Sequence, residues 1–420
     1  MWRWKRKYST SADFRFFIFT VLVPLSAATP TTQDQFREAV RAGDQPVVIR
    51  LIPESDLDAR DPLGAAALHD AVWSGRVEIV RLLLQAGADP NITHLEAGST
   101  PLDYAAVKNE PEIAQLLLDR GANVRAVNRS GSTALHLAAA RGYTAVARLL
   151  LDHGASIQAL DGSGSTPLEE AAWKGFAEMC ALLLDRGALV NALNPETGKS
   201  PLNEAASNGH LAAARLLLAR GADPSLADKS GATPLQNAAR LNDGDIVSIL
   251  LTGKNSISAA DLLDNAVLEG QSEIARLLIE HGADVNAPGK SGSTPLGDAA
   301  LKGRLELARL LLSRGARVDA VDRFGSMPLH DAALSGNSAV VELLLAAGAP
   351  INAQDRESGA TPLYNAASMG HPEVVSLLLA RGADPELSTK AGSTPLHAAL
   401  ANNFPETAAL LRSQRSAPQK

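Results

Sequence analysis

Hydrophobic and polar positions recur along this chain with a period of about 33 residues from Thr100 onward. Each period holds a short apolar stretch rich in alanine, a second stretch rich in leucine, and a polar segment. The units start at equivalent positions, which are Thr100, Thr133, Thr166, Ser200, Thr233, Asp261, Thr294, Met327, Thr361 and Thr394. Degenerate units precede them, starting near Asp34 and Ala66. A fixed period of this length indicates a stacked array of one small unit rather than a globular core.

The unit that starts at Thr166 shows which elements the pattern predicts. Thr166 is expected to cap a first helix, with Pro167 in its first turn and Glu169 completing a capping box. Gly175 should end this helix in the left-handed conformation. A second helix is predicted through the leucines that follow, and a polar turn leads back to the next unit. One such helix pair cannot bury its apolar faces alone, so stability should come from stacking.

Several recurring motifs point to a known family. They include Thr294-Pro295-Leu296, histidine in the fourth position of this motif at His330 and His397, and the run Gly282-Ala283-Asp284-Val285-Asn286. In these positions the chain resembles ankyrin repeat proteins over roughly residues 32–412. The resemblance implies an all-α fold, a right-handed α-solenoid of helix-turn-helix units with projecting β-turn fingers and a concave binding face. About 12 units are expected, including the caps.

The period also predicts the domain organisation. The expected segments are a signal peptide at 1–28, an N-terminal capping repeat at 29–61, ankyrin repeats at 62–258 and 259–391, a C-terminal capping repeat at 392–412 and a frayed tail at 413–420. Some units are one residue longer, and the extra residue should lie in the fingers at 94–98, 194–198 and 355–359. The unit before Asp261 is shortened, so 252–260 should lack a finger while Asp261 caps the next helix. We expect continuous stacking there, with a hinge as the alternative.

The N-terminus has the layout of a secretory signal. A basic start is followed by a mostly apolar stretch at 16–25 and by small residues at 26–28. The apolar stretch is too short to span a bilayer comfortably, so no stable membrane span is expected after cleavage. This layout predicts a periplasmic or secreted, bacterial protein. The alternative is a protein anchored in the membrane by an uncleaved N-terminal segment.

Charge and cysteine content restrict the partners. Without residues 1–28, which contain five basic residues and one acidic residue, the chain has 34 Lys and Arg against 45 Asp and Glu, a net charge of about −11. An acidic array argues against nucleic acid as a partner and favours a protein with a basic surface. Cys180 is the only cysteine, so no intramolecular disulfide is possible, and we expect it to be a core thiol. A monomer is expected.

Recognisable catalytic motifs do not occur in the sequence. Gly198-Lys199-Ser200 and Gly289-Lys290-Ser291 resemble the end of a phosphate-binding loop, but Leu193 and Asp284 stand where the loop needs its first glycine. We therefore expect no cofactor, no metal and no catalytic residue. The resemblance implies a structural role for the histidines in the fourth position of the cap motif, which are His69, His136, His330 and His397.

One series of positions departs from the family habit. The position after the histidine, where leucine is common in ankyrin units, is acid or amide in every unit from Glu170 to Asn365. Tryptophans stand three residues further on in two units, on a neighbouring part of the same helix face. The candidate binding residues are therefore Asp70, Trp73, Tyr104, Glu170, Trp173, Glu204, Asn237, Asn265, Asp298, Asp331 and Asn365. They are interpreted either as a solvated row beside partly buried spacers or as a concave recognition strip.

These observations predict a non-enzymatic scaffold that binds another protein through its concave face and finger tips, outside the cytoplasm. Two alternatives belong to other classes: a hydrolase that uses acids of the concave row, and a passive structural protein of the envelope. Acids of consecutive units should lie too far apart to share one cation, because packed helices are about 8–10 Å apart.

Overall fold

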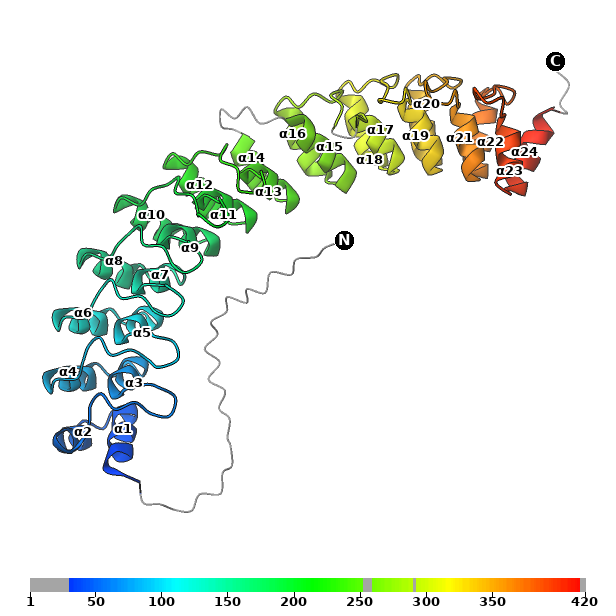
Figure 1. Ribbon diagram of the computed structural model, residues 1–420. Coiled ribbons are helices and arrows are strands. Elements are labelled where there is room, and N and C mark those ends of the chain that lie inside the picture. Colours follow the sequence, from blue (N-terminus) through cyan, green and yellow to red (C-terminus); the bar gives the residue numbers. More distant parts are fainter. Residues whose placement is uncertain (1–29, 252–258, 290–291, 416–420) are drawn as a thin grey trace.

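The computed structural model describes residues 30–251, 259–289 and 292–415, and all regular elements in these ranges are helices. Figure 1 shows them as a curved row of antiparallel pairs. The first helices of the pairs line the inside of the curve, and these are α3, α5, α7, α9, α11 and α13. The first half contains α1 (Thr32–Ala42), α2 (Gln45–Leu51), the 3₁₀ helix η1 (Ile52–Glu54), α3 (Ala67–Trp73), α4 (Val77–Gln85), α5 (Pro101–Lys108), α6 (Pro111–Asp119), α7 (Ala134–Ala139), α8 (Thr144–Asp152), α9 (Pro167–Lys174), α10 (Ala177–Asp185), α11 (Pro201–Ser207) and α12 (Leu211–Ala219). The second half contains α13 (Pro234–Arg240), α14 (Gly244–Leu251), α15 (Ala259–Glu269), α16 (Ser272–Glu280), α17 (Pro295–Leu301), α18 (Leu305–Ser313), α19 (Pro328–Ser335), α20 (Ser338–Ala346), α21 (Pro362–Met369), α22 (Pro372–Ala380), α23 (Pro395–Ala401) and α24 (Pro405–Arg415). The predicted ankyrin-type α-solenoid is confirmed.

The caps of the first helices form as the sequence predicts. In α9 the Glu169 N–H donates to Thr166 Oγ1 at 3.2 Å, and the Thr166 N–H donates to Glu169 Oε2 at 2.7 Å. This reciprocal pair is a capping box, and it satisfies two backbone donors that the helix itself cannot satisfy. Gly175 ends the helix with φ +79°, the left-handed conformation that glycine adopts at little cost.

The core is one continuous layer that runs through the stack. It extends from Phe36 to Leu411, and the first helix of each unit contacts the first helices of its neighbours. Ala171 and Ala172 are fully buried at such a contact, where their small side chains allow close approach. Leucines of the second helices, such as Leu183, fill the space between the two rows. No unit has a separate core, so each unit depends on its neighbours for stability.

The fingers are turns built around a side-chain acceptor. Asp161 Oδ1 accepts the N–H groups of Ser163 and Ser165, and the Gly162 N–H donates to Ser130 O of the preceding finger at 2.8 Å. The Asp161 N–H donates to Ser165 O, whereas in the longer finger the His94 N–H donates to Ser99 O, one residue further on. The extra residue therefore lies in the finger, as predicted.

The shortened unit departs from the prediction at one residue. Helix α15 begins at Ala259, so Asp261 lies inside the helix and is not its N-cap. Alanines at 259 and 260 are strong helix formers and extend the helix by this length. Packing continues across the junction, because α13 contacts α15 and α14 contacts α16. The truncated finger and the alternative of a hinge at 252–260 fall mainly on residues 252–258, which lie outside the described residues.

The ends of the array correct a second detail. Residues 413–415, assigned to the frayed tail, are the last turn of α24, whereas 416–420 and the predicted signal at 1–28 lie outside the described residues. Cys180 is fully buried in α10, which confirms a core thiol, and burial raises its pKa to about 12. Among the helices that the structure describes, none has the length and apolar character needed to cross a bilayer.

Candidate protein-binding surface

The histidines of the cap motif connect adjacent units. His136 Nδ1 accepts the Thr133 N–H at 3.2 Å, and its Nε2 lies 3.1 and 3.0 Å from the carbonyl oxygens of Ala159 and Ser165 in the next finger. Nε2 must carry the proton to donate to these carbonyls, so the ring is neutral. Burial lowers the pKa of His136, in keeping with that state. His69 and His330 make equivalent bonds, which confirms the structural role that the resemblance implies.

Other residues stand at this position in the units that lack histidine. Asn203 donates from Nδ2 to Leu226 O at 2.9 Å and so keeps the bond to the next finger. Asp103 and Glu169 instead point back to their own caps, and burial raises the pKa of each carboxyl to about 7. Gly297 has no side chain that could reach the next finger.

The first predicted binding residue is held by an internal ion pair. Asp70 Oδ2 contacts the Arg37 guanidinium of the N-terminal cap, and Arg41 Nε lies 3.1 Å from the same oxygen. Arg37 is largely buried and also donates to the Ala65 carbonyl at 2.7 Å, the bond that histidine makes in later units. Asp70 is therefore already neutralised within the array.

Trp73 of α3 and Tyr104 of α5 lie together on the inner helices of two adjacent units. Their ring centroids are 5.7 Å apart in an edge-to-face arrangement, and Lys108 Nζ lies 4.7 Å from the Trp73 ring. His69 lies 5.1 Å from Tyr104 on its other side. Burial, together with the nearby carboxylates of Asp70 and Asp61, raises the pKa of Tyr104 to about 12.

The middle of the row contains both paired and unpaired acids. Lys199 Nζ lies 3.2 Å from Glu204 Oε2, and both side chains are mostly buried. Glu170 makes no side-chain hydrogen bond or ion pair with the described residues, and burial and the nearby Asp161 raise its pKa to about 7. Trp173 is half-buried, with Lys174 Nζ 3.8 Å from its ring centroid.

The amides and the last two acids have different environments. Asn237 is buried and accepts from Arg240 at 3.4 Å, Asn365 donates to His330 O at 3.5 Å, and Asn265 is exposed. Asp298 is 4 % exposed, and its Oδ2 has no hydrogen-bond partner. Asp331 is half-buried, and burial, with the charges of Asp322 and Asp298, raises its pKa to about 8.

A solvated row is therefore the wrong interpretation for most of these positions. Of the residues predicted as binding residues, only Asn265 is exposed. The predicted residues do not converge on one site, because they occupy successive units along the inner face. Asp70 and Glu204 form internal ion pairs, whereas Glu170, Asp298 and Asp331 form none with the described residues. Whether they bind a partner stays a prediction.

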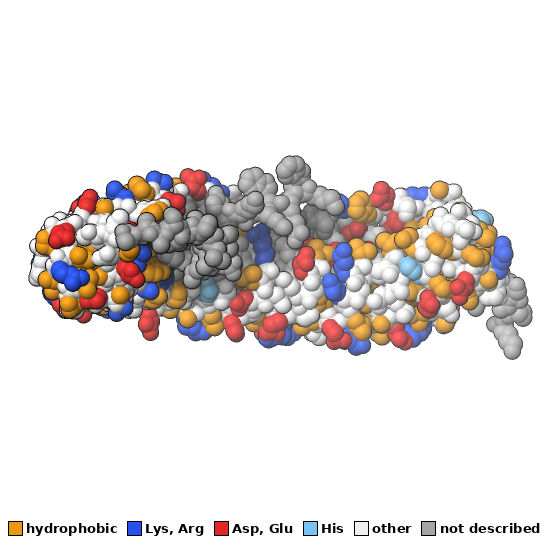
Figure 2. All heavy atoms as spheres, turned by 90° about the horizontal axis from the view of Figure 1, so that it is seen from below, with side chains coloured by type: hydrophobic (Ala, Val, Ile, Leu, Met, Phe, Trp, Pro, Cys, Tyr) orange, Lys and Arg blue, Asp and Glu red, His pale blue; other side chains and the backbone are white. Residues whose placement is uncertain are grey.

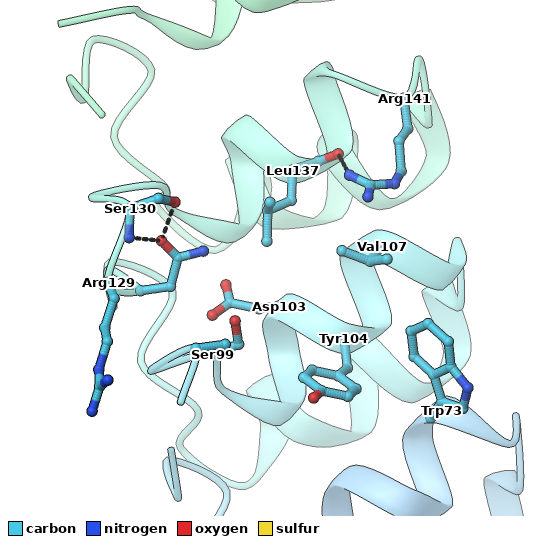
Figure 3. A pocket seen from close by; sticks show the side chains of 11 residues that line it. Trp73, Ser99, Asp103, Tyr104, Val107, Arg129, Ser130, Leu137 and Arg141 are labelled. Atoms are coloured by element: carbon cyan, nitrogen blue, oxygen red, sulfur yellow. Dashed lines mark hydrogen bonds between the residues drawn. The ribbon is translucent and has the colours of Figure 1, made fainter. Parts of the chain in front are cut away.

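A pocket of about 300 Å³ opens where Asp103 replaces the longer histidine. Figure 3 shows Asp103 between Leu137 and Ser99, with Tyr104 and Trp73 to one side and Arg141 at another edge. Asp103, Leu137 and Arg141 line this pocket and are not among the binding residues predicted from the sequence. The signal that could have found the pocket is the loss of a ring at a position where ankyrin units carry histidine.

Surface charge and metal-binding geometry add little specific chemistry. On the face that Figure 2 shows, outside the grey atoms, basic and acidic side chains alternate and no extended basic area appears. Within the described ranges, no group of three or more His, Cys, Asp or Glu side chains is arranged to hold a metal ion. The inner face therefore offers isolated acids, aromatic rings and leucines, which are groups suited to contacts with a protein.

Comparison with known proteins agrees with this architecture. The family model for ankyrin repeats (3 copies) matches residues 36–128, 102–194, 189–261, 261–322 and 329–419. Protein phosphatase 1 regulatory subunit 27 of Mus musculus is 42% identical over 95 residues, which are 22% of this chain and 61% of that protein. The Notch-regulated ankyrin repeat-containing protein of Xenopus tropicalis is 32% identical over 100 residues, 23% of this chain and 87% of the relative. The B-cell lymphoma 3 protein homolog of Mus musculus is 45% identical over 71 residues, 17% of this chain and 16% of the relative.

These matches are regional. The chain spans about three fifths of the phosphatase regulatory subunit that it matches, and the aligned segments are a quarter of this chain or less. The family model, in contrast, covers nearly the whole array. The chain belongs to the ankyrin repeat family.

Proposed function

We propose that this protein is a non-enzymatic scaffold that binds another protein through its concave face and finger tips, outside the cytoplasm. The observation that carries the proposal is the inner face itself, where Glu170, Asp298 and Asp331 form no side-chain hydrogen bond or ion pair with the residues that the structure describes. Relatives named as regulatory subunits and ankyrin repeat proteins support a role in protein interaction. A preformed surface of this kind binds with little loss of backbone entropy.

The charge pattern suits a partner with a basic surface. In their charged forms, which dominate above the raised pKa values of Glu170 (about 7) and Asp331 (about 8), these acids attract a basic partner over distance and raise the rate of association at low salt. Replacing Glu170, Asp298 and Asp331 by alanine should therefore slow association, whereas replacing Glu204, which pairs with Lys199, should change the rate little.

The test is stoichiometric capture by the full chain from an extracytoplasmic fraction, followed by cross-linking and mass spectrometry. The proposal predicts cross-links on the first helices and fingers. The absence of any stoichiometric partner would favour a passive structural role. Hydrolytic activity whose pH dependence follows the acids of the concave row would favour the enzyme alternative.

Export from the cytoplasm is a separate part of the proposal. It is supported by the basic start, the apolar stretch at 16–25 and the small residues before position 29. Mass spectrometry of the protein from its native host should find a mature N-terminus near residue 29. An intact N-terminus in the membrane fraction would indicate the uncleaved anchor instead, and an intact N-terminus in the cytoplasm would contradict export.

A further inference from the structure

Two acidic side chains of adjacent units, Asp298 and Asp331, lie near each other. Asp298 of α17 and Asp331 of α19 are close enough for their charges to interact, and Asp322 of the intervening finger adds a third negative charge. Neither Asp298 nor Asp331 forms a side-chain hydrogen bond or ion pair with the described residues. Asp298 is 4 % exposed, so water does little to stabilise its charge. Buried acids without partners are costly, which marks this place as unusual in the array.

Gly297 gives Asp331 its position. A side chain at position 297 would place its Cβ 2.9 Å from Asp331 Oδ2, so this carboxylate lies directly against the glycine backbone. In the neighbouring unit the same position is His330, whose ring reaches the carbonyls of Ala353 and Ala360. Gly297 removes that ring, and the acid of the next unit occupies the adjoining space.

Exposed leucines flank the two acids. Leu301 and Leu334 stand three residues after Asp298 and Asp331 on the same helices and are 40% and 37% exposed. Residues at this spacing are neighbours on a helix surface. The surface therefore combines two acidic groups that lack partners among the described residues with accessible apolar area.

We infer that this surface, formed by Asp298, Asp331, Leu301 and Leu334, binds a short basic and apolar segment of a protein partner. A guanidinium or ammonium group of the segment lies between the two carboxyl groups and stabilises their charged forms, and an apolar side chain covers the two leucines. Arginine fits best, because its planar group presents several donors at once. The inference rests on the proposed function and specifies where one part of the partner binds.

A metal ion is a poorer occupant of the same place. Hard cations need several oxygen ligands, and the described residues offer no cluster of three or more potential ligands. The leucines next to the acids add nothing to metal binding, whereas they complement the aliphatic part of an organic cation.

The experiment is a display selection of random linear peptides on the full chain, with depletion on the double variant Asp298→Asn, Asp331→Asn. Peptides that survive should contain arginine or lysine near a large apolar residue. Their dissociation constants should rise about 10-fold or more in the double variant, the loss expected for a hydrogen bond to a charged group. The matched control is Glu204→Gln, because Glu204 is an acid of the same row that already pairs with Lys199. This variant should leave the affinity of the peptides within about twofold.

Two further measurements separate binding from folding. The double variant replaces two acids that lack partners among the described residues, so its thermal midpoint should not fall, and lost binding cannot then reflect unfolding. Gly297→Ala keeps both charges but displaces the Asp331 carboxylate, and it should also weaken the selected peptides.

The inference is overturned if no peptide survives depletion or if the survivors lack basic residues. Peptides that bind wild type and double variant equally, but are displaced by changes elsewhere on the inner face, would remove this site and leave the proposed function intact. Failure of the capture and cross-linking experiment would instead remove the proposed function.

Discussion

Arg37 and Asp70 form an ion pair between the N-terminal cap and the next unit, with both side chains largely buried. The same guanidinium donates to the carbonyls of Ala59 and Ala65, as histidine does in later units. One arginine thus provides the contact between units and neutralises an acid of the inner face. Asp70 therefore differs from Asp298 and Asp331, which form no ion pair with the described residues.

Replacing Arg37 by methionine should loosen the N-terminal cap. The change leaves Asp61 and Asp70 with Arg41 alone, so we expect a loss of about 2–4 kcal/mol, somewhat below the cost of removing the sole partner of a buried charge. Hydrogen exchange in α1 and α2 should accelerate. Arg50→Met, an exposed arginine of α2, is the control and should leave exchange unchanged. Equal protection in both variants would show that the pair does not hold the cap.

Asp331→Asn should stabilise the protein, and more so at alkaline pH. The pKa of Asp331 is raised from 3.8 to about 8, so the folded state favours the protonated acid. Its contribution to stability is present at low pH and is lost as pH rises through about 8, when the charge forms beside Asp298 and Asp322. Removing the ionisable group should therefore add about 1–3 kcal/mol at pH 9 and little at pH 4. Urea unfolding at the two pH values measures the difference, and an equal effect at both would contradict the assigned cause.

His69→Asn should make the array less sensitive to acid. Burial lowers the pKa of His69 from 6.5 to about 4, so its contribution is present above 6.5 and is lost as pH falls towards 4. Asparagine does not titrate in this range, and Asn203 shows that it can reach the next finger. The urea midpoint should therefore fall less between pH 7 and pH 4 in the variant. His153→Asn, an exposed histidine, should behave as wild type; a wild-type acid response in His69→Asn would rule out this histidine as the cause.

Leu183→Ala should weaken the middle of the stack. Leu183 is fully buried between the two helix rows, and such truncation costs about 2–5 kcal/mol through lost burial and the cavity that remains. Hydrogen exchange should accelerate most in α9 to α12, since each unit depends on its neighbours. The exposed Leu193 provides the control, because alanine there should change exchange little.

Local rules predicted most of the fold. The threonine caps, the proline in the first turn and the leucine rhythm depend on residues within one unit, so the sequence exposes them directly. The prediction that Asp261 caps the helix was wrong, because the two alanines before it are strong helix formers and the helix begins at Ala259.

The character of the inner face was harder to predict, because it depends on contacts between units. Asp70 and Asp298 occupy equivalent positions, yet Asp70 pairs with Arg37 from the preceding unit, whereas Asp298 forms no ion pair with the described residues. The period shows that these positions are equivalent, but it does not show which side chains of neighbouring units reach them. The pocket beside Asp103 was missed for the same reason, since residues of adjacent units line it together.

Photo-cross-linking from single positions tests most directly whether the concave face binds the partner. A photoreactive amino acid replaces Leu334 on the inner face or Arg309 on α18, both exposed, and the full chain is irradiated with its captured partner. Binding through the concave face predicts adducts from position 334 and few from position 309. Adducts from position 309 alone, or equal adducts from both positions, would contradict it.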